Sequence, residues 1–100
     1  MLFTIIGYDI ENSLERRLAA RPAHVVRLEI LQQQGRLNLA GPFPVASDDA
    51  VHQGFVGSLI VADFESLAAA RAWADADPYV AAGVYTKVDI FPFKQVFPSQ

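Results

Sequence analysis

The chain contains no cysteine, which excludes disulfides, thiolate nucleophiles and cysteine-ligated zinc or iron–sulfur sites. No apolar run approaches the roughly 20 residues of a membrane-spanning helix, and residues 1–6 lack the basic start of a signal peptide. Basic residues are scarce as well, since the net charge is -3, and this argues against nucleic acid as a partner. These absences predict a soluble cytoplasmic protein with neither membrane nor nucleic acid among its partners.

Metal and phosphate motifs are missing too. The two histidines, His24 and His52, lie far apart among scattered acidic residues, which is not the spacing of a metal-ligand cluster. Gly54 and Gly57 lack the lysine and hydroxyl of a phosphate-binding loop. The sequence therefore predicts no metal site and no cofactor.

Apolar residues, by contrast, are plentiful. A chain of 100 residues is long enough for one domain with a real core, and residues 1–100 are predicted to form it. The hydrophobic fraction is 52% and the charged fraction only 19%, which is apolar for such a short chain. This excess indicates a further face that is buried against something else.

The hydrophobic periodicity predicts four strands and two helices, over residues 2–8, 14–34, 36–40, 54–63, 67–75 and 84–91. Pro22 is expected to make the first helix restart, and Gly41–Pro44 is expected to end the second strand. Residues 45–53 are typical of a loop.

The β-α-β-β-α-β order is typical of the α+β ferredoxin-like fold, an antiparallel sheet with both helices on one face. The other face of such a sheet is normally polar, yet the first and third strands are apolar on both sides. A second copy of the chain is the simplest cover, which predicts a homodimer packed through the open sheet face. The tail 92–100 carries Phe93, Val96 and Phe97 and is expected to add to that contact.

A corner at residues 75–85 organises the second half of the chain. Asp77 directly precedes Pro78, where a helix cannot simply continue, and this pair suits the N-cap and first position of a new turn. Gly83 would close the turn before the last strand. On local grounds Asp77 is at least as good a cap as a catalyst.

His24 is the most promising side chain on the first helix. It shares an apolar stripe with Leu28 and Leu31, so its imidazole should point inward and needs a polar partner. Spacing alone favours a core-edge histidine bonded to backbone or water. Arg21 is either an ordinary solvated arginine or an anion-binding group, and Arg17 would share its face only if the helix were continuous.

Two tyrosines stand at predicted strand ends. Tyr8 and Tyr85 could donate their hydroxyls to a pocket, although packing residues with solvated tips are the commoner case.

Several segments together resemble the YCII-related family. They are Arg21-Pro22-Ala23-His24, Ala40-Gly41-Pro42, Gly54-Phe55-Val56-Gly57-Ser58 and Ala72–Tyr79. The resemblance covers nearly the whole chain and implies a dimeric α-β barrel of ferredoxin-like subunits, similar in shape to muconolactone isomerase. It also implies a His–Asp general acid/base pair, as in a dechlorinating member that acts on hydroxylated aromatics. By motif the pair falls on His24 and Asp77, with Arg21 as the arginine beside it.

Two functions follow as hypotheses. The first is a cofactor-independent isomerase, lyase or dehalogenase, in which His24 and Asp77 move a proton on a small anionic or enol-forming substrate. Its cleft is expected to be lined by Arg21, Pro42 and Phe43, with a hydroxyl from Tyr8. The alternative is a binding protein that holds a small metabolite in the same pocket without turnover. A scaffold that serves only dimer contact is a weaker third reading.

Overall fold

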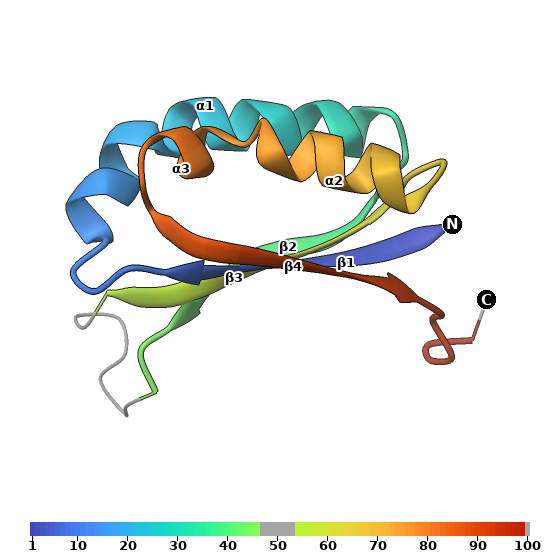
Figure 1. Cartoon of the computed structure of the whole chain (residues 1–100). Coiled ribbons are helices and arrows are strands. Elements are labelled where there is room, and N and C mark those ends of the chain that lie inside the picture. Colours follow the sequence, from blue (N-terminus) through green and yellow to red (C-terminus); the bar gives the residue numbers. More distant parts are fainter. Residues whose placement is uncertain (47–53, 100) are drawn as a thin grey trace.

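The computed structural model describes residues 1–46 and 54–99, which form a four-stranded antiparallel sheet and three helices. The elements are β1 (Leu2–Asp9), α1 (Leu14–Gln33), β2 (Leu37–Pro44), β3 (Phe55–Asp63), α2 (Leu67–Asp75), α3 (Pro78–Ala81) and β4 (Tyr85–Phe93). The strands lie in the order β2-β3-β1-β4, and the helices cover one face of the sheet (Figure 1). This is the predicted α+β ferredoxin-like fold.

Most of the predicted loop at 45–53, including His52, lies outside the described residues. Among the helices of the described ranges, none combines the length and the apolar character that crossing a bilayer would require.

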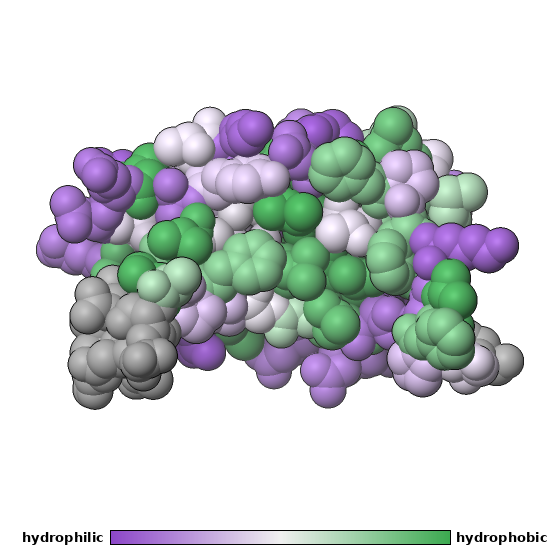
Figure 2. Space-filling view, turned by 90° about the horizontal axis from the view of Figure 1, so that it is seen from below, coloured by the Kyte–Doolittle hydropathy of each residue, from purple (hydrophilic) through white to green (hydrophobic). Residues whose placement is uncertain are grey.

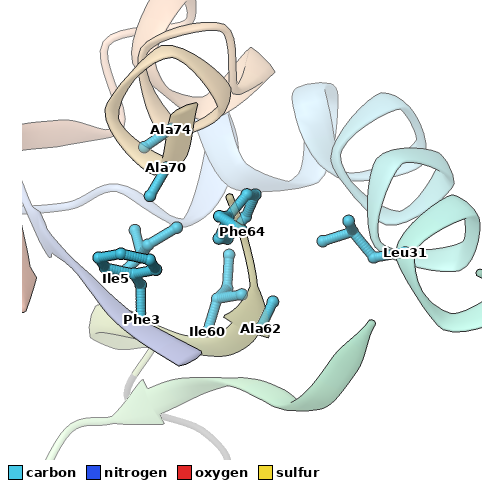
Figure 3. Close-up of a cluster of buried hydrophobic side chains, with 8 residues drawn as sticks. All are labelled: Phe3, Ile5, Leu31, Ile60, Ala62, Phe64, Ala70 and Ala74. Carbon is cyan, nitrogen blue, oxygen red and sulfur yellow. The ribbon is translucent and has the colours of Figure 1, made fainter. Parts of the chain in front are cut away.

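The core lies between the sheet and the helices, where eight buried side chains meet (Figure 3). Alternate residues of the two central strands face the helices, and the buried residues of α2 are the small Ala70 and Ala74. The alanines let the backbone of α2 approach the sheet closely, so larger side chains from the strands fill the remaining space. The cluster consists of Phe3, Ile5, Leu31, Ile60, Ala62, Phe64, Ala70 and Ala74.

Helix α1 does not restart at Pro22, as the sequence predicted, but runs unbroken through it for 20 residues. Pro22 is solvent-exposed, and a proline inside a helix removes one backbone hydrogen bond without preventing the turns on either side. Those turns are held by burial of Arg17, His24 and Leu31, which recur every seven residues and so lie on one face. The continuous helix therefore aligns polar side chains that a restart would have separated.

The second strand also differs from the prediction, because β2 continues through Gly41–Pro44 instead of ending there. The spatial order makes β2 an edge strand, and proline is tolerated at an edge, where one row of backbone N–H groups has no partner strand. Edge strand β4 likewise continues through Pro92 to Phe93.

The face of the sheet opposite the helices is apolar in its middle (Figure 2). Strand alternation places Leu39 and Phe91 there, because Leu39 pairs with Val61 and Phe91 pairs with Thr4. Phe93 pairs with Leu2 on the same face. Leu39, Phe91 and Phe93 are about half exposed, at 50%, 53% and 43%. These three side chains are called the open-face patch below.

Candidate functional site

The imidazole of His24 lies against the carboxylate of Asp77. Nδ1 of His24 is 2.9 Å from Oδ1 and 3.0 Å from Oδ2 of Asp77, and both residues are buried, at 7% and 4% exposure. An ionised carboxylate only accepts hydrogen bonds, so Nδ1 carries the proton in this contact. In the neutral ring Nε2 then keeps its lone pair, which is the form of a general base.

Asp77 is held in place by the corner that the sequence predicted. It is the N-cap of α3, its backbone is extended, and Oδ1 accepts a hydrogen bond of 2.8 Å from the backbone N–H of Tyr79. Pro78 occupies the first turn of α3, and Gly83 follows with a positive φ of 74°. Asp77 therefore caps a helix and contacts the imidazole of His24 at the same time, so capping does not preclude the pairing.

Aromatic rings fix the orientation of His24. The imidazole stacks on the ring of Tyr79 with centroids 3.9 Å apart and planes 12° from parallel, and Tyr79 in turn meets Tyr85 edge to face at 5.7 Å. Burial raises the pKa of Tyr79, which the positive charges of Arg17 and Arg21 partly counteract. The stack leaves the imidazole little freedom to turn away from Asp77.

A cavity of about 290 Å³ opens beside His24, between α1 and the strands β2 and β3. Its walls are mostly aliphatic, and the polar side chains that reach it are few. They are Arg17, Arg21, His24, Ser58 and Tyr79.

Of the residues predicted to line the cleft, Arg21 and Pro42 do so, whereas Tyr8 and Phe43 are not among the cavity's lining residues. Pro42 pairs with Ser58 on the helix side of the sheet, while Tyr8 and Phe43 both pair with Gly57 on the opposite side. A shift of one residue along a strand changes the face, which is why Pro42 and Phe43 separate.

A buried ion pair beneath the cavity was not predicted from the sequence. Nε of Arg17 donates to Oδ2 of Asp9 at 2.6 Å and Nη2 donates to Oδ1 at 3.0 Å, while Ser13 also donates to Oδ2 at 2.6 Å. Nη2 of Arg17 further contacts the Gly57 carbonyl at 2.9 Å and Ser58 Oγ at 2.7 Å. The only sequence signal was the spacing of Arg17 with Arg21 and His24.

The ion pair is electrostatically well matched. Burial alone would lower the pKa of Arg17, but the hydrogen bond and negative charge of Asp9 outweigh it, so the pKa is raised and the guanidinium stays charged. Because Arg17 is already paired with Asp9, Arg21 is the cavity arginine better placed to offer charge to a ligand. No acidic partner of Arg21 is found among the described residues.

A further arginine, Arg27, interacts with the charge of Asp77. Arg27 packs over the ring of Trp73 at 4.2 Å and donates from Nη2 to the Trp73 carbonyl at 2.8 Å, in the last turn of α2. Burial lowers the pKa of Arg27, and the negative charge of Asp77 works against that. The carboxylate of Asp77 thus interacts with the charge of Arg27 as well as with His24.

In the described part of the chain, no group of three or more His, Asp or Glu side chains is arranged to hold a metal ion. The chemistry that the arrangement offers is proton transfer at His24, next to a mainly apolar cavity with a positive charge at Arg21.

Known proteins of one family match nearly the whole chain. The family model described as YCII-related domain matches residues 1–94. The protein YciI of Escherichia coli O6:H1 is 58% identical over 98 residues, covering 97% of this chain and 100% of that protein. A protein of Haemophilus influenzae is 50% identical over the same shares of both chains.

Among solved structures, a similar fold occurs in the 5-chloro-2-hydroxyhydroquinone dehydrochlorinase TftG of Burkholderia phenoliruptrix, in complex with 2,5-dihydroxybenzoquinone. The two chains superpose with a TM-score of 0.83 and 25% sequence identity, and each is covered completely.

Proposed function

Because this chain belongs to the YCII-related family, we propose that it is an acid–base enzyme that needs no cofactor and acts on a small anionic or enol-forming substrate. The observation that carries the proposal is the buried contact between His24 and Asp77 at the wall of the cavity. A histidine whose Nδ1 is engaged by a carboxylate presents Nε2 in a defined direction and is stabilised when it becomes charged.

In the proposed reaction Nε2 of His24 removes a proton from a hydroxyl or an acidic C–H of the substrate. The electron pair moves into the substrate as an enolate, and the imidazolium beside Asp77 is stabilised by the carboxylate. The proton then returns to carbon, which completes an isomerisation. Where that carbon carries a halogen, loss of a second hydroxyl proton and cleavage of the carbon–halogen bond release halide, so the substrate loses a hydrogen halide overall and no oxidant is needed. Arg21 would hold the substrate's negative charge at the cavity wall.

The name of the structural neighbour supports the elimination branch. That protein is a dehydrochlorinase of a chlorinated hydroxyhydroquinone, and its structure contains a dihydroxybenzoquinone. A ring with ionisable hydroxyls is both anionic and enol-forming. The cavity here has mostly aliphatic walls and the charge of Arg21, with which no acidic side chain of the described residues pairs, and it offers surroundings of the kind that such a ring requires.

The test uses 5-chloro-2-hydroxyhydroquinone as the probe substrate and chloride release as the signal, with non-chlorinated hydroxyquinols followed by absorbance for isomerisation. We expect His24→Ala and Asp77→Asn each to lower turnover roughly 10²–10⁴-fold, since general acid–base catalysis typically contributes that much. Asparagine also caps helices, so Asp77→Asn should leave the fold intact.

The matched control is Asp75→Asn, which neutralises an exposed carboxylate two residues away. The two losses should be strongly non-additive, because each variant disables the same unit. Binding of 2,5-dihydroxybenzoquinone with no turnover of any probe would favour the binding-protein alternative. Full turnover in His24→Ala would refute the mechanism.

We further propose that a second copy of the chain covers the open sheet face. The open-face patch is apolar, and ion-paired side chains of both signs, Lys87 and Asp89, stand beside it on β4. A patch with an apolar centre and mixed charges is self-complementary about a two-fold axis. The exposed tail side chains Val96 and Phe97, at 64% and 81%, would extend the same contact.

Light scattering after size exclusion should give a dimer at micromolar concentration. Phe91→Asp and removal of the residues beyond Pro92 should both weaken it, whereas Val26→Asp, on the exposed side of α1, should not. A monomeric wild-type protein would end the dimer proposal without touching the acid–base proposal.

A further inference from the structure

A second, much smaller cavity lies beside Asp77 and shares Ser58 and Ile60 with the wall of the main one. Its volume is about 10 Å³, and it is enclosed by β1, β3 and β4 with α2 above. Three of the side chains around it are polar, and the others are small or aliphatic, such as Ile5, Gly7 and Ala74. The polar three are Ser58, Asp77 and Tyr85.

Gly7 creates the room for Tyr85. A Cβ atom on Gly7 would lie 2.5 Å from Cζ of the Tyr85 ring, so only glycine lets the ring lie flat over the strand. Burial strongly raises the pKa of Tyr85, against a smaller lowering by the hydroxyl of Ser58. Tyr85 therefore keeps its phenolic proton and is a hydrogen-bond donor at any ordinary pH.

Ser58 can donate a further hydrogen bond, and Asp77 can accept one. Ser58 Oγ already accepts from Nη2 of Arg17 at 2.7 Å, so its own proton is available to another acceptor. Asp77 accepts from Tyr79 N–H and His24 Nδ1, and a carboxylate can accept about four hydrogen bonds. The cavity thus places donors and a remaining acceptor around one point.

We infer that this cavity binds one ordered water molecule, bridging Asp77 to Tyr85 and Ser58, and that Tyr85 and Ser58 are positioning residues for the His24–Asp77 pair. A buried water needs roughly 10–15 Å³ and two to four polar partners, and both requirements are met here. The water donates to Asp77, accepts from the Tyr85 hydroxyl, and exchanges one hydrogen bond with Ser58.

The bridge completes the support of the carboxylate. The Tyr79 N–H fixes Asp77 from the backbone, His24 contacts it on the cavity side, and the water fixes it from the sheet side. Groups behind a catalytic side chain that fix its rotation commonly affect activity without touching the substrate. The inference rests on the proposed function for its catalytic consequence, but the water itself does not depend on any substrate.

A crystal structure of the wild-type protein at high resolution tests the water directly. We expect electron density for one water within hydrogen-bond distance of the Tyr85 hydroxyl and of a carboxylate oxygen of Asp77. A cavity without that density would overturn the inference, and no variant is required for this measurement.

The positioning role is tested by measuring how fast the His24 Nδ1–H proton exchanges with solvent, using ¹⁵N-resolved NMR. In Tyr85→Phe, and in Ser58→Ala as a second variant, we expect this proton to exchange with solvent roughly 3- to 10-fold faster. A change of that size corresponds to the net free energy of about one hydrogen bond. Tyr8→Phe, which removes a phenolic hydroxyl on the opposite face of the sheet, is the matched control. Unchanged exchange in both test variants would overturn the positioning role.

These readouts separate the two proposals. If His24→Ala lowers turnover while Tyr85→Phe leaves both Nδ1–H exchange and turnover unchanged, the acid–base function stands and the positioning role of Tyr85 fails. If the water and the exchange effect are found but no probe is turned over, the bridge stands and the proposed function fails.

Discussion

The buried pair of Asp9 and Arg17 should be the most costly polar contact of the fold to break. The Asp9 side chain is fully buried and Arg17 is 6% exposed, and the carboxylate accepts three hydrogen bonds. In Asp9→Asn the guanidinium would stay buried without a counter-charge, and the new amide NH₂ would face donors. Removing one partner of a buried pair costs about 3–5 kcal/mol, a large part of the 5–15 kcal/mol that typically holds a domain.

The measurements are urea unfolding and thermal unfolding of wild type and variant at one fixed protein concentration, because association would also change both midpoints. At about 4–8 °C per kcal/mol for a domain of this size, the melting temperature should fall by more than about 12 °C. The control is Asp75→Asn, which breaks the exposed Arg71–Asp75 pair of α2 at 3.6 Å and should cost less than about 0.5 kcal/mol.

A double variant, Asp9→Leu with Arg17→Met, separates lost pairing from lost packing. It removes both charges, so it should be more stable than Asp9→Asn. Recovery should be incomplete, since Ser13, Ser58 and the Gly57 carbonyl lose their partners. The reasoning is refuted if Asp9→Asn lowers the free energy of unfolding no more than Asp75→Asn does. It is also refuted if the losses caused by substitution at Asp9 and at Arg17 simply add in the double variant.

Two further perturbations follow from the fold. Pro22→Ala should stabilise the protein by about 1 kcal/mol, because it restores a backbone N–H inside α1 and removes the clash of the proline ring with the preceding turn. The gain is partly offset because the unfolded chain becomes more flexible. A lower urea midpoint would contradict this prediction. Tyr85 titrates with a raised pKa in the fold, so the unfolded chain loses its proton first, and stability should fall as the pH rises above about 10. Urea midpoints at pH 8 and 10.5 should show a smaller alkaline loss in Tyr85→Phe than in wild type, and an equal loss would contradict the assignment.

Local rules were enough to predict the corner at Asp77. Whether an Asp-Pro pair caps a turn depends on backbone preferences of neighbouring residues, which the sequence contains. The inward orientation of His24 followed from helical periodicity in the same way. Both predictions concern single elements, and the family resemblance supplied the pairing between them.

The errors arose where neighbouring elements decide the outcome. Pro22 and Gly41–Pro44 are breakers by local preference, yet one lies on an exposed helix face and the other on an edge strand, where a missing N–H costs little. The pairing of Asp9 with Arg17 could not be read from the chain, because it needs the angle at which α1 leaves β1.

Alternation along β1 explains why the sequence could not assign Tyr8. Leu2, Ile6 and Tyr8 form one apolar set and Phe3 and Ile5 the other, so hydrophobicity does not say which set faces the helices. The same alternation separates the two proposals physically. Gly7 makes room for Tyr85 on the helix side, next to the candidate site, whereas its neighbours point toward the open face. Substitutions at adjacent positions of β1 should therefore affect the acid–base pair or the dimer contact, but not both.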